Sequence, residues 1–584
     1  MHARADAILK SHKILSLHSP EKVKKNNMDR RKFIKNTGYG LGFATFSPHI
    51  IATAKNSRGS FRHGLASGDP LHNQIILWTR VTPETDLPIK IKWQMSHNPN
   101  FNPVVSEGET VTDKQRDYCV KVNAILPDGE TPGTTYFYRF LTGNHSSETG
   151  RTHTLPDQRV NKIKLAVMSC SKYTAGFFHV YKEIANRDDI DLVLHLGDYI
   201  YEFGMGVFGD EDAKALNREV VPRYELNSLE DYRQRYAQHK SDPDSQAMLA
   251  RHPLISIWDD HEISNDAWRL GAVNHSTDGS EGTFENRKKN AIKAYFEWMP
   301  IREPASDNSF IHRSFQIGDL VDLHMLDTRL IGRDQQLSYS NYTGLKTKQK
   351  PVHILNKTPK QFDSKQFHQD LLEPNRSILG ANQEMWLERR LKTTNATWTV
   401  LGQQVMLAPQ RWSVTKDLIE QESSEDSQEL KMAMQKQTIK PELTKNLDAW
   451  DGYPVARSRL YDMIAEHKKK LITLSGDTHF SSAHNLVTAS GRLIGAEFGT
   501  TSVTSPSFWD DVKINKIELE KRQLDFNEGM QFLHLRNRGY LVVEIDREKT
   551  VGKWHLIDDV KTENYKVWLE QTLVLEGSKK DGLI

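Results

Sequence analysis

Cysteine is nearly absent from this chain, whose 584 residues include only Cys119 and Cys170. Two cysteines cannot build a disulfide framework, which excludes the small disulfide-stabilised domains as a class. We expect no disulfide between them, and Cys119 to be a small buried apolar residue. Charge of one sign is lacking too, because 78 basic and 76 acidic residues leave a net charge of +2. This balance argues against dedicated nucleic-acid binding, so a substrate must be held by a local site.

The chain also lacks an apolar run long enough for a permanent membrane span. The short run from Gly38 to Ile51 follows Arg30 and Arg31, and it precedes the small residues of 52–54. This order is typical of an export signal, and paired arginines are typical of the twin-arginine pathway, which carries folded proteins. We therefore expect a twin-arginine signal region over 1–54, with Met28 as an alternative start. The protein would be periplasmic or secreted, with the twin-arginine export machinery as a partner.

The rest of the chain is too long for one hydrophobic core, and its composition, 37% hydrophobic, is that of a folded protein. Residues 58–156 contain short β-type runs with alternating apolar residues, such as 89–94 and 135–140, separated by turn residues. Runs at this spacing predict a small β-sandwich of the immunoglobulin-like or fibronectin-like kind. It holds no cluster of catalytic residue types, so we expect it to be structural.

Residues 160–550 show a different pattern, in which near-continuous apolar strands alternate with helical segments. This pattern predicts buried sheets flanked by helices, and residues 551–584 are expected to be a C-terminal extension. Two polar stretches, 335–367 and 416–445, are interpreted as insertions. The apolar strands are expected at 164–169, 192–196, 254–258, 321–326, 398–401 and 471–474.

Four of these strands run directly into polar residues of the kinds that bind metals. The four segments are 169–171, 197–202, 259–262 and 475–479. Sites in open α/β sheets form outside the carboxyl ends of the strands, so we expect these segments to converge on a metal site. His195, inside an apolar strand, is instead interpreted as a core histidine.

The same four segments, together with 61–70, 326–329 and 380–383, resemble the PhoD-like alkaline phosphatase and phosphodiesterase family, a branch of the calcineurin-like metallophosphoesterases. The resemblance runs from Phe61 to near Glu544. It implies an α+β chain in which the N-terminal all-β sandwich precedes a four-layer α-β-β-α catalytic sandwich. It also implies an enzyme that acts on phosphate esters by in-line attack of a metal-bound hydroxide.

The resemblance carries metal ligands onto matching positions of this sequence. Gly197-Asp198 with Tyr201 matches the family's Gly-Asp-x-x-Tyr form, and the ions implied are Fe³⁺ and Ca²⁺. Residue chemistry alone indicates a transition metal at a thiolate and phenolate end and a hard cation (calcium, magnesium or manganese) at a carboxylate end. The implied ligands are Cys170, Asp198, Tyr201, Asp260, Asn265, Asp477 and His479.

Two further residues are expected to act on the phosphate. His261 would stabilise the transition state or protonate the leaving alkoxide. Arg329 is a candidate phosphate clamp, with a salt bridge to Asp327 or another carboxylate as its alternative. The competing functions are a phospholipase D-like or nuclease-like diesterase and a non-catalytic binding protein stabilised by metals.

Overall fold

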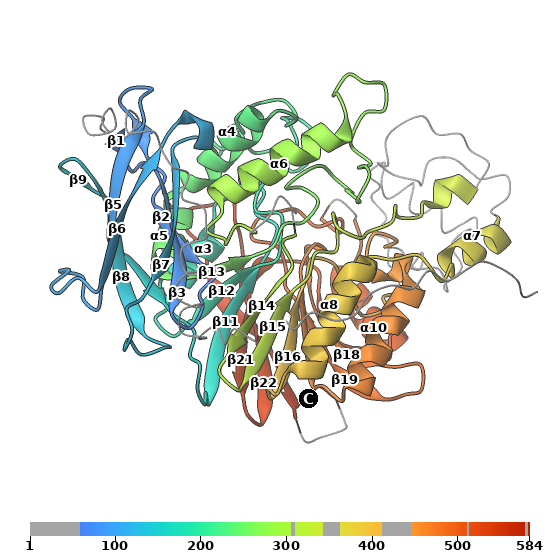
Figure 1. Ribbon diagram of the computed structural model, residues 1–584. Helices are drawn as coiled ribbons and strands as arrows, with labels where there is room; N and C mark the ends of the chain where they lie inside the picture. Colours follow the sequence, from blue (N-terminus) through green and yellow to red (C-terminus); the bar gives the residue numbers. More distant parts are fainter. Residues whose placement is uncertain (1–58, 305–309, 343–362, 412–445, 511–512, 578–581) are drawn as a thin grey trace, which may run out of the picture. The chain divides into compact units, whose positions relative to one another are not determined.

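The computed structural model describes residues 59–304, 310–342, 363–411, 446–510, 513–577 and 582–584. The predicted signal region lies outside the described residues, as does most of the two predicted insertions. Within the described part the chain is a mixed α/β protein with several sheets (Figure 1). None of the helices described there combines the length and apolar composition needed to cross a bilayer.

Two large sheets contain most of the strands. The first has nine strands in the order β23-β22-β21-β11-β12-β13-β2-β3-β7, and the second has seven in the order β14-β15-β16-β17-β19-β18-β20. The strands of the first are β2 (Leu65–Gly68), β3 (Gln74–Arg80), β7 (Cys119–Ile125), β11 (Lys162–Met168), β12 (Leu192–His195), β13 (Leu254–Ser256), β21 (Arg538–Asp546), β22 (Lys549–Ile557) and β23 (Val567–Glu576). Those of the second are β14 (Arg313–Ile317), β15 (Val321–Met325), β16 (Trp398–Gly402), β17 (Leu471–Ser475), β18 (Ser481–Val487), β19 (Leu493–Gly499) and β20 (Met530–His534).

Helices pack on both large sheets. One core cluster joins apolar side chains of both sheets with those of α3 (His179–Ala185), α4 (Leu229–Lys240), α5 (Pro243–Arg251) and α6 (Phe284–Trp298). A second cluster joins the other face of the seven-stranded sheet to α8 (Gly380–Thr393) and α10 (Pro454–Glu466), as Figure 1 shows. The remaining helices among the described residues are α7 (Ser364–Leu371), α11 (Lys516–Phe526) and the short 3₁₀ segments Lys114–Arg116, Tyr173–Ala175, Tyr339–Tyr342 and Trp450–Gly452.

The six apolar strands expected from the sequence are β11, β12, β13, β15, β16 and β17. β12 is buried at every position, as a parallel inner strand should be, whereas β8 (Thr135–Thr142) alternates buried and half-buried residues. Capping side chains mark where two helices begin. Ser228 and Asp231 form a capping box at the N-terminus of α4, and Asp242 caps the N-terminus of α5 just before Pro243.

The N-terminal strands share a sheet with the strands that follow them. A five-stranded sheet packs against β2, β3 and β7 around its own core cluster, but β2 also pairs with β13 through Gly68 and Leu254. A Cβ atom at Gly68 would lie 2.6 Å from the carbonyl oxygen of Leu254 and 2.1 Å from that of Pro300, so only glycine permits this close pairing. The local periodicity of the sequence does not show that β2 pairs with β13. The five strands are β5 (Ile89–Ser96), β6 (Ser106–Thr112), β8 (Thr135–Thr142), β9 (His145–Ser146) and β10 (Gly150–His153); β1 (Gly59–Ser60) pairs separately with β4 (Thr82–Pro83).

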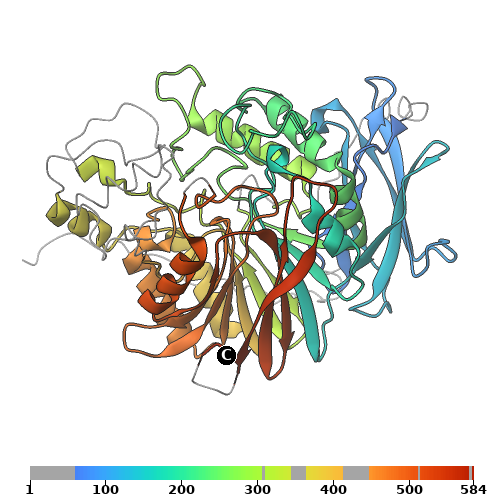
Figure 2. The ribbon, with the colours of Figure 1, turned by 180° about the vertical axis from the view of Figure 1, so that it is seen from behind.

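The C-terminal strands close the same sheet. β21 pairs antiparallel with β11, and β22 and β23 continue the sheet beyond it. In Figure 2 these strands, in red, lie beside the teal β11. The segment 551–584 therefore contributes most of β22 and all of β23 to the large sheet.

Lys240, the last residue of α4, is fully buried between the rings of Trp78 and Tyr199, with Nζ 4.9 and 5.0 Å from their centroids. Its ammonium has no hydrogen-bond partner among the described residues. Burial lowers the pKa of Lys240 to about 7, while the neighbouring Cys119 acts in the opposite direction. The folded state therefore disfavours the charged form that the unfolded chain retains up to about pH 10.5.

Replacing Lys240 with methionine is expected to stabilise the protein by roughly 1–3 kcal/mol at pH 7, since it removes a poorly compensated buried charge. The destabilisation caused by Lys240 grows as the pH falls from about 10.5 to 7 and is constant below that. The gain should therefore be largest at and below pH 7 and vanish above pH 10.5. Thermal unfolding of the variant and the wild type at pH 7 and pH 9 measures the gain. A variant that melts at a lower temperature than the wild type at pH 7 would contradict this account.

Candidate metal centre

The four polar segments singled out in the sequence meet at one edge of the two sheets. β11, β12 and β13 are parallel neighbours, so their carboxyl ends lie at the same edge. The end of β17 approaches them from the other sheet: a Cβ atom at Gly476 would lie 2.6 Å from Oγ of Ser169 and 3.6 Å from Cβ of Leu196. Segments far apart in the chain thus converge as expected.

Three groups of potential ligands lie there, each with its ligand atoms within 4.8 Å of one another. They share Asp198 and Asp260, so together they form one continuous centre. The groups are Cys170, Asp198 and His479; Asp198, Asp260 and His261; and Asp259, Asp260 and Asp477. Five of the seven predicted ligands therefore belong to these groups.

The other two predicted ligands lie beside the centre. Tyr201 donates its hydroxyl hydrogen to Oδ2 of Asp198 (3.1 Å), and its oxygen lies 3.3 Å from Nε2 of His479. Asn265 contacts the centre through its backbone N–H, which donates to Oε1 of Glu202 (2.6 Å). Tyr201 is thus placed to act as a ligand, whereas the contact shown for Asn265 is a backbone one.

Four of the predicted ligands have left-handed backbone conformations. Their φ angles are 62° at Cys170, 56° at Asp198, 64° at Asp477 and 58° at His479. Such angles are uncommon for residues other than glycine and cost of order 1–3 kcal/mol each. Strain of this kind persists only where the surrounding structure imposes it, and it clusters at functional sites. The sequence carries no signal for it.

The orientation of His479 leaves one ring nitrogen available to a metal. Nδ1–H donates to the backbone carbonyl of Pro506 (2.7 Å), which places the lone pair on Nε2, the nitrogen facing Tyr201. Burial lowers the pKa of His479 to about 4, so the imidazole is neutral at neutral pH. This is the form that binds metals.

The centre is short of positive charge at its candidate ligands. Burial raises the pKa of Cys170, Asp198, Tyr201 and Asp477 well above their usual ranges, and neighbouring carboxylates add to the effect. Oδ1 of Asp198 and Oδ1 of Asp260 are buried and accept no hydrogen bond from the described residues. Cations there would favour the anionic forms and satisfy both oxygens. The donor set therefore fits metal ions.

Arg329 balances the carboxylate end of the centre. Its fully buried guanidinium pairs with Asp259, with Asp448 (2.6 Å) and with Asp477 (3.2 Å), and it lies 3.4 Å from Oδ1 of Asp260. Among the described contacts its donors face carboxylates, which is the alternative that the sequence left open, while Asp327 accepts from its backbone N–H. Asp448 was not found from the sequence, because it follows a polar stretch without any motif.

His261 is oriented by a buried carboxylate. Its Nδ1–H donates to Oε2 of Glu202 (2.7 Å), a residue with no exposed surface. Burial alone would lower the pKa of His261, but Glu202, Asp198 and Asp260 raise it well above its usual value. This contact does not engage the other ring nitrogen, Nε2. In the sequence, the only indication that Glu202 orients His261 was its position at the end of the segment 197–202.

Two minor predictions are confirmed. Cys119 and Cys170 are both buried and both free, with Cys119 inside β7. His195 is a buried core residue whose Nε2 lies 3.2 Å from Oγ of Ser171.

Comparison with known proteins agrees with this geometry. The model of the family described as PhoD-like phosphatase matches residues 165–554, and that of its N-terminal domain matches 46–156. Alkaline phosphatase D of Bacillus subtilis (strain 168) is 31% identical over 547 residues, covering 89% of this chain and 83% of the relative. The solved structure of PhoD matches with a TM-score of 0.72 at 29% identity, covering 90% of this chain and 92% of that one. The chain belongs to the PhoD-like phosphatase family and is a phosphoric ester hydrolase.

Proposed function

We propose that this protein hydrolyses phosphate esters with two cations held at the centre described above. The observation that carries the proposal is the pair of buried oxygens, Oδ1 of Asp198 and Oδ1 of Asp260, which accept no hydrogen bond from the described residues and belong to the same ligand group as the oriented His261. Asp198 belongs to two of the three ligand groups, so one carboxylate can serve both ions. Cys170, Tyr201 and His479 would hold Fe³⁺, and Asp260 with Asp477 would hold Ca²⁺, Mg²⁺ or Mn²⁺.

The bound cations would supply Lewis-acid polarisation of the phosphate and an activated water. The protein's own groups then position the ester and protonate its leaving group. Glu202 holds Nδ1–H of His261, so Nε2–H is directed away from it and can donate a proton to the leaving alkoxide. Arg329 pairs with the carboxylates of Asp259 and Asp477, which favours their ionised forms against the effect of burial and holds them in place. In this mechanism His261 contacts the substrate, and Glu202 and Arg329 are positioning residues.

The metals can be tested on protein purified without chelator. We expect iron and a hard cation by elemental analysis, and a visible absorption band because phenolate and thiolate donate electron density to ferric iron. Activity is measured on 4-nitrophenyl phosphate and bis(4-nitrophenyl) phosphate, which also separates monoesterase activity from the diesterase alternatives, including the phospholipase D-like one.

Tyr201→Phe removes the phenolate with little change of shape, so it should alter the band and weaken metal retention. A colourless, fully active enzyme without iron would overturn the iron assignment alone. Activity that chelators leave intact would overturn the metal dependence.

We also propose export by the twin-arginine pathway, supported by the order of Arg30, Arg31, the apolar run and the small residues of 52–54. Replacing both arginines with lysine should leave the precursor in the cytoplasm. Cleavage after Ala54 should give a mature chain starting at Lys55. Cell fractionation and N-terminal sequencing measure both; normal export of the double variant would contradict the pathway.

The architecture of the two domains is proposed as well. Residues 58–156 would be an immunoglobulin-like or fibronectin-like sandwich, and 160–550 a four-layer α-β-β-α sandwich. Support comes from the separate core around β5 and β8 and from the clusters that join helices to each large sheet. Superposition of a crystal structure on known domains of both kinds tests the proposal, and a different strand order in either would reject it.

A further inference from the structure

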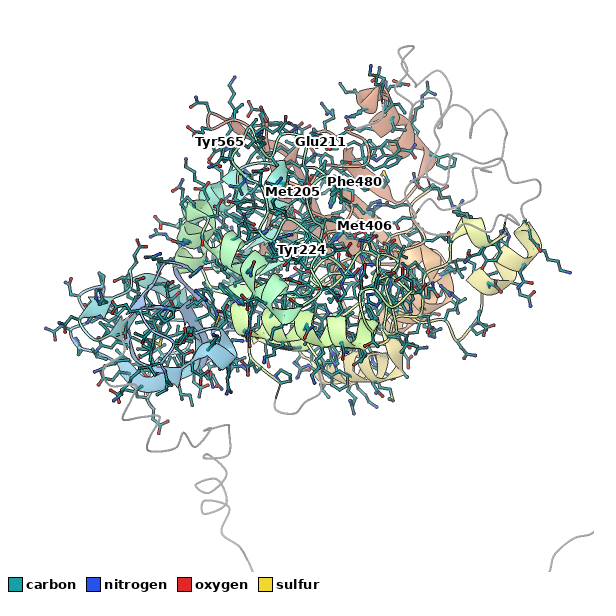
Figure 3. The ribbon with its side chains drawn as sticks, turned by 90° about the horizontal axis from the view of Figure 1, so that it is seen from above. Met205, Glu211, Tyr224, Met406, Phe480 and Tyr565 are labelled. Carbon is teal, nitrogen blue, oxygen red and sulfur yellow. The ribbon has the colours of Figure 1, made fainter. Side chains whose placement is uncertain are left out.

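The loop from Gly204 to Asp210 carries an aromatic side chain onto the metal centre. The ring of Phe208 stacks toward that of His479 at 6.3 Å between centroids and lies 6.4 Å from that of Tyr201. Phe208 packs against Cys170, Tyr201 and Phe203 but remains partly exposed to solvent. Figure 3 labels Met205 and Glu211, which bracket Phe208 in the sequence, and Phe480, which follows His479.

A second ring extends this surface to the residue proposed to act on the phosphate. Phe203 lies 6.2 Å from Phe208 and 5.0 Å from His261, edge to face in both cases. The two phenylalanines therefore form an aromatic wall, defined here as Phe203 and Phe208, that runs from His261 to His479. Phe203 is itself buried, so Phe208 is the member of this wall that an ester beside His261 would meet.

The loop is fastened at both ends. The carboxylate of Asp210 accepts hydrogen bonds from Thr174 Oγ1 (2.6 Å) and from the backbone N–H of Gly206 (2.7 Å), and it lies 3.3 Å from Nζ of Lys172. Lys172 is fully buried, and its ammonium faces the rings of Phe203 and Phe208. Asp210 thus ties the loop to the segment that follows Cys170.

The other end is held by Arg235 of α4. Its fully buried guanidinium donates to the backbone carbonyls of Tyr201 and Phe203, which immediately precede the loop, and of Val221 and Pro222 after it. A wall held in this way is preformed, so a substrate would not have to order it on binding.

On the basis of the proposed function, we propose that Phe208 is a specificity-determining residue that selects phosphate esters with an aryl or similarly flat apolar alcohol group. A flat apolar group stacks on a partly exposed ring and removes its surface from water, whereas a small polyol gains nothing there. Asp210 is the positioning residue that keeps the ring in place.

The test compares esters that differ only in their alcohols. Bis(4-nitrophenyl) phosphate is set against bis(2-hydroxyethyl) phosphate, or phenyl phosphate against 2-hydroxyethyl phosphate if the enzyme prefers monoesters. For each ester, kcat/KM of the variant is divided by that of the wild type, so intrinsic reactivity cancels. Phe208→Ala should lower the aryl value about 5- to 20-fold and the hydroxyethyl value less than about 2-fold.

Three further variants separate specificity from structure. Phe208→Tyr keeps the ring and should keep the aryl preference, and Val207→Ala, an exposed neighbour, should change neither value. Asp210→Asn should reduce the aryl preference by a smaller factor than Phe208→Ala does. If Asp210→Asn leaves the aryl preference unchanged, Asp210 does not position the ring of Phe208. Metal content should remain that of the wild type throughout.

Two failures can be told apart. Equal losses on both esters in Phe208→Ala, with or without metal loss, would show that Phe208 only shields the centre and would overturn the specificity. Wild-type protein that cleaves none of these esters would overturn the proposed function itself.

Discussion

Asp198→Asn is expected to lower kcat/KM by about 1,000-fold or more and to reduce the content of both metals. The neutral amide keeps the size of the side chain but cannot balance two cations as a carboxylate does. The local backbone should survive, because it is held by bonds from the N–H groups of Asp198 and Tyr199 to Glu262, which the substitution does not touch. Elemental analysis and steady-state kinetics on the same preparation measure both effects.

Asp242→Asn is the matched control for this substitution. Asp242 is also a buried aspartate, but it caps α5 and pairs with Arg218 away from the ligand groups. We expect it to lower the melting temperature while the metal content and kcat stay near those of the wild type. A fully active, metal-replete Asp198→Asn enzyme would reject the two-cation centre.

The second large effect is expected at His261. His261→Ala should lower kcat by about 100- to 10,000-fold, the usual range for loss of a general acid, while both metals remain bound. The separation follows from its place in the centre, because His261 is held by Glu202 and its free nitrogen is proposed to serve the leaving group. Loss of metal in parallel with activity would make His261 a ligand instead.

The pH dependence of kcat gives a further readout. A protonated His261 acts as the acid, so the rate should fall as the pH rises through its pKa, which the neighbouring carboxylates hold well above its usual value. Glu202→Gln removes one of these charges and lowers that pKa, so the fall should move to lower pH. His261→Ala should abolish the fall altogether. An unchanged profile in Glu202→Gln would exclude the positioning role of that carboxylate.

The positions of the candidate ligands could be predicted because the signal is local. Each of Cys170, Asp198, Asp260 and Asp477 directly follows an apolar strand, and parallel strands bring such ends together. Resemblance to a family then indicated which of these side chains to propose as metal ligands, a step that strand patterns alone do not provide.

The charge balance of the centre could not be predicted in the same way. Arg329 has four carboxylate neighbours from three distant segments, including Asp448, and nothing near Asp448 in the sequence marks it. The sharing of one sheet by β2 and β13 was hidden for a similar reason, since it depends on the absence of a side chain at Gly68. Pairings between remote segments leave no trace in local periodicity.

The pairing of β11 with β21 has a consequence for biosynthesis. Lys162 and Glu544, which meet across this pair, are 382 residues apart, so on the ribosome β11 remains an edge strand until nearly the whole chain has emerged. Cys170, the first candidate ligand along the chain, comes just after β11. The sheet that positions it is therefore incomplete during most of translation. Pairings of such long range form slowly, and an open strand edge invites association with other chains. A nascent or truncated chain that lacks β21 should therefore depend on chaperones, and the proposed metal centre would be complete only once synthesis of the polypeptide is nearly finished.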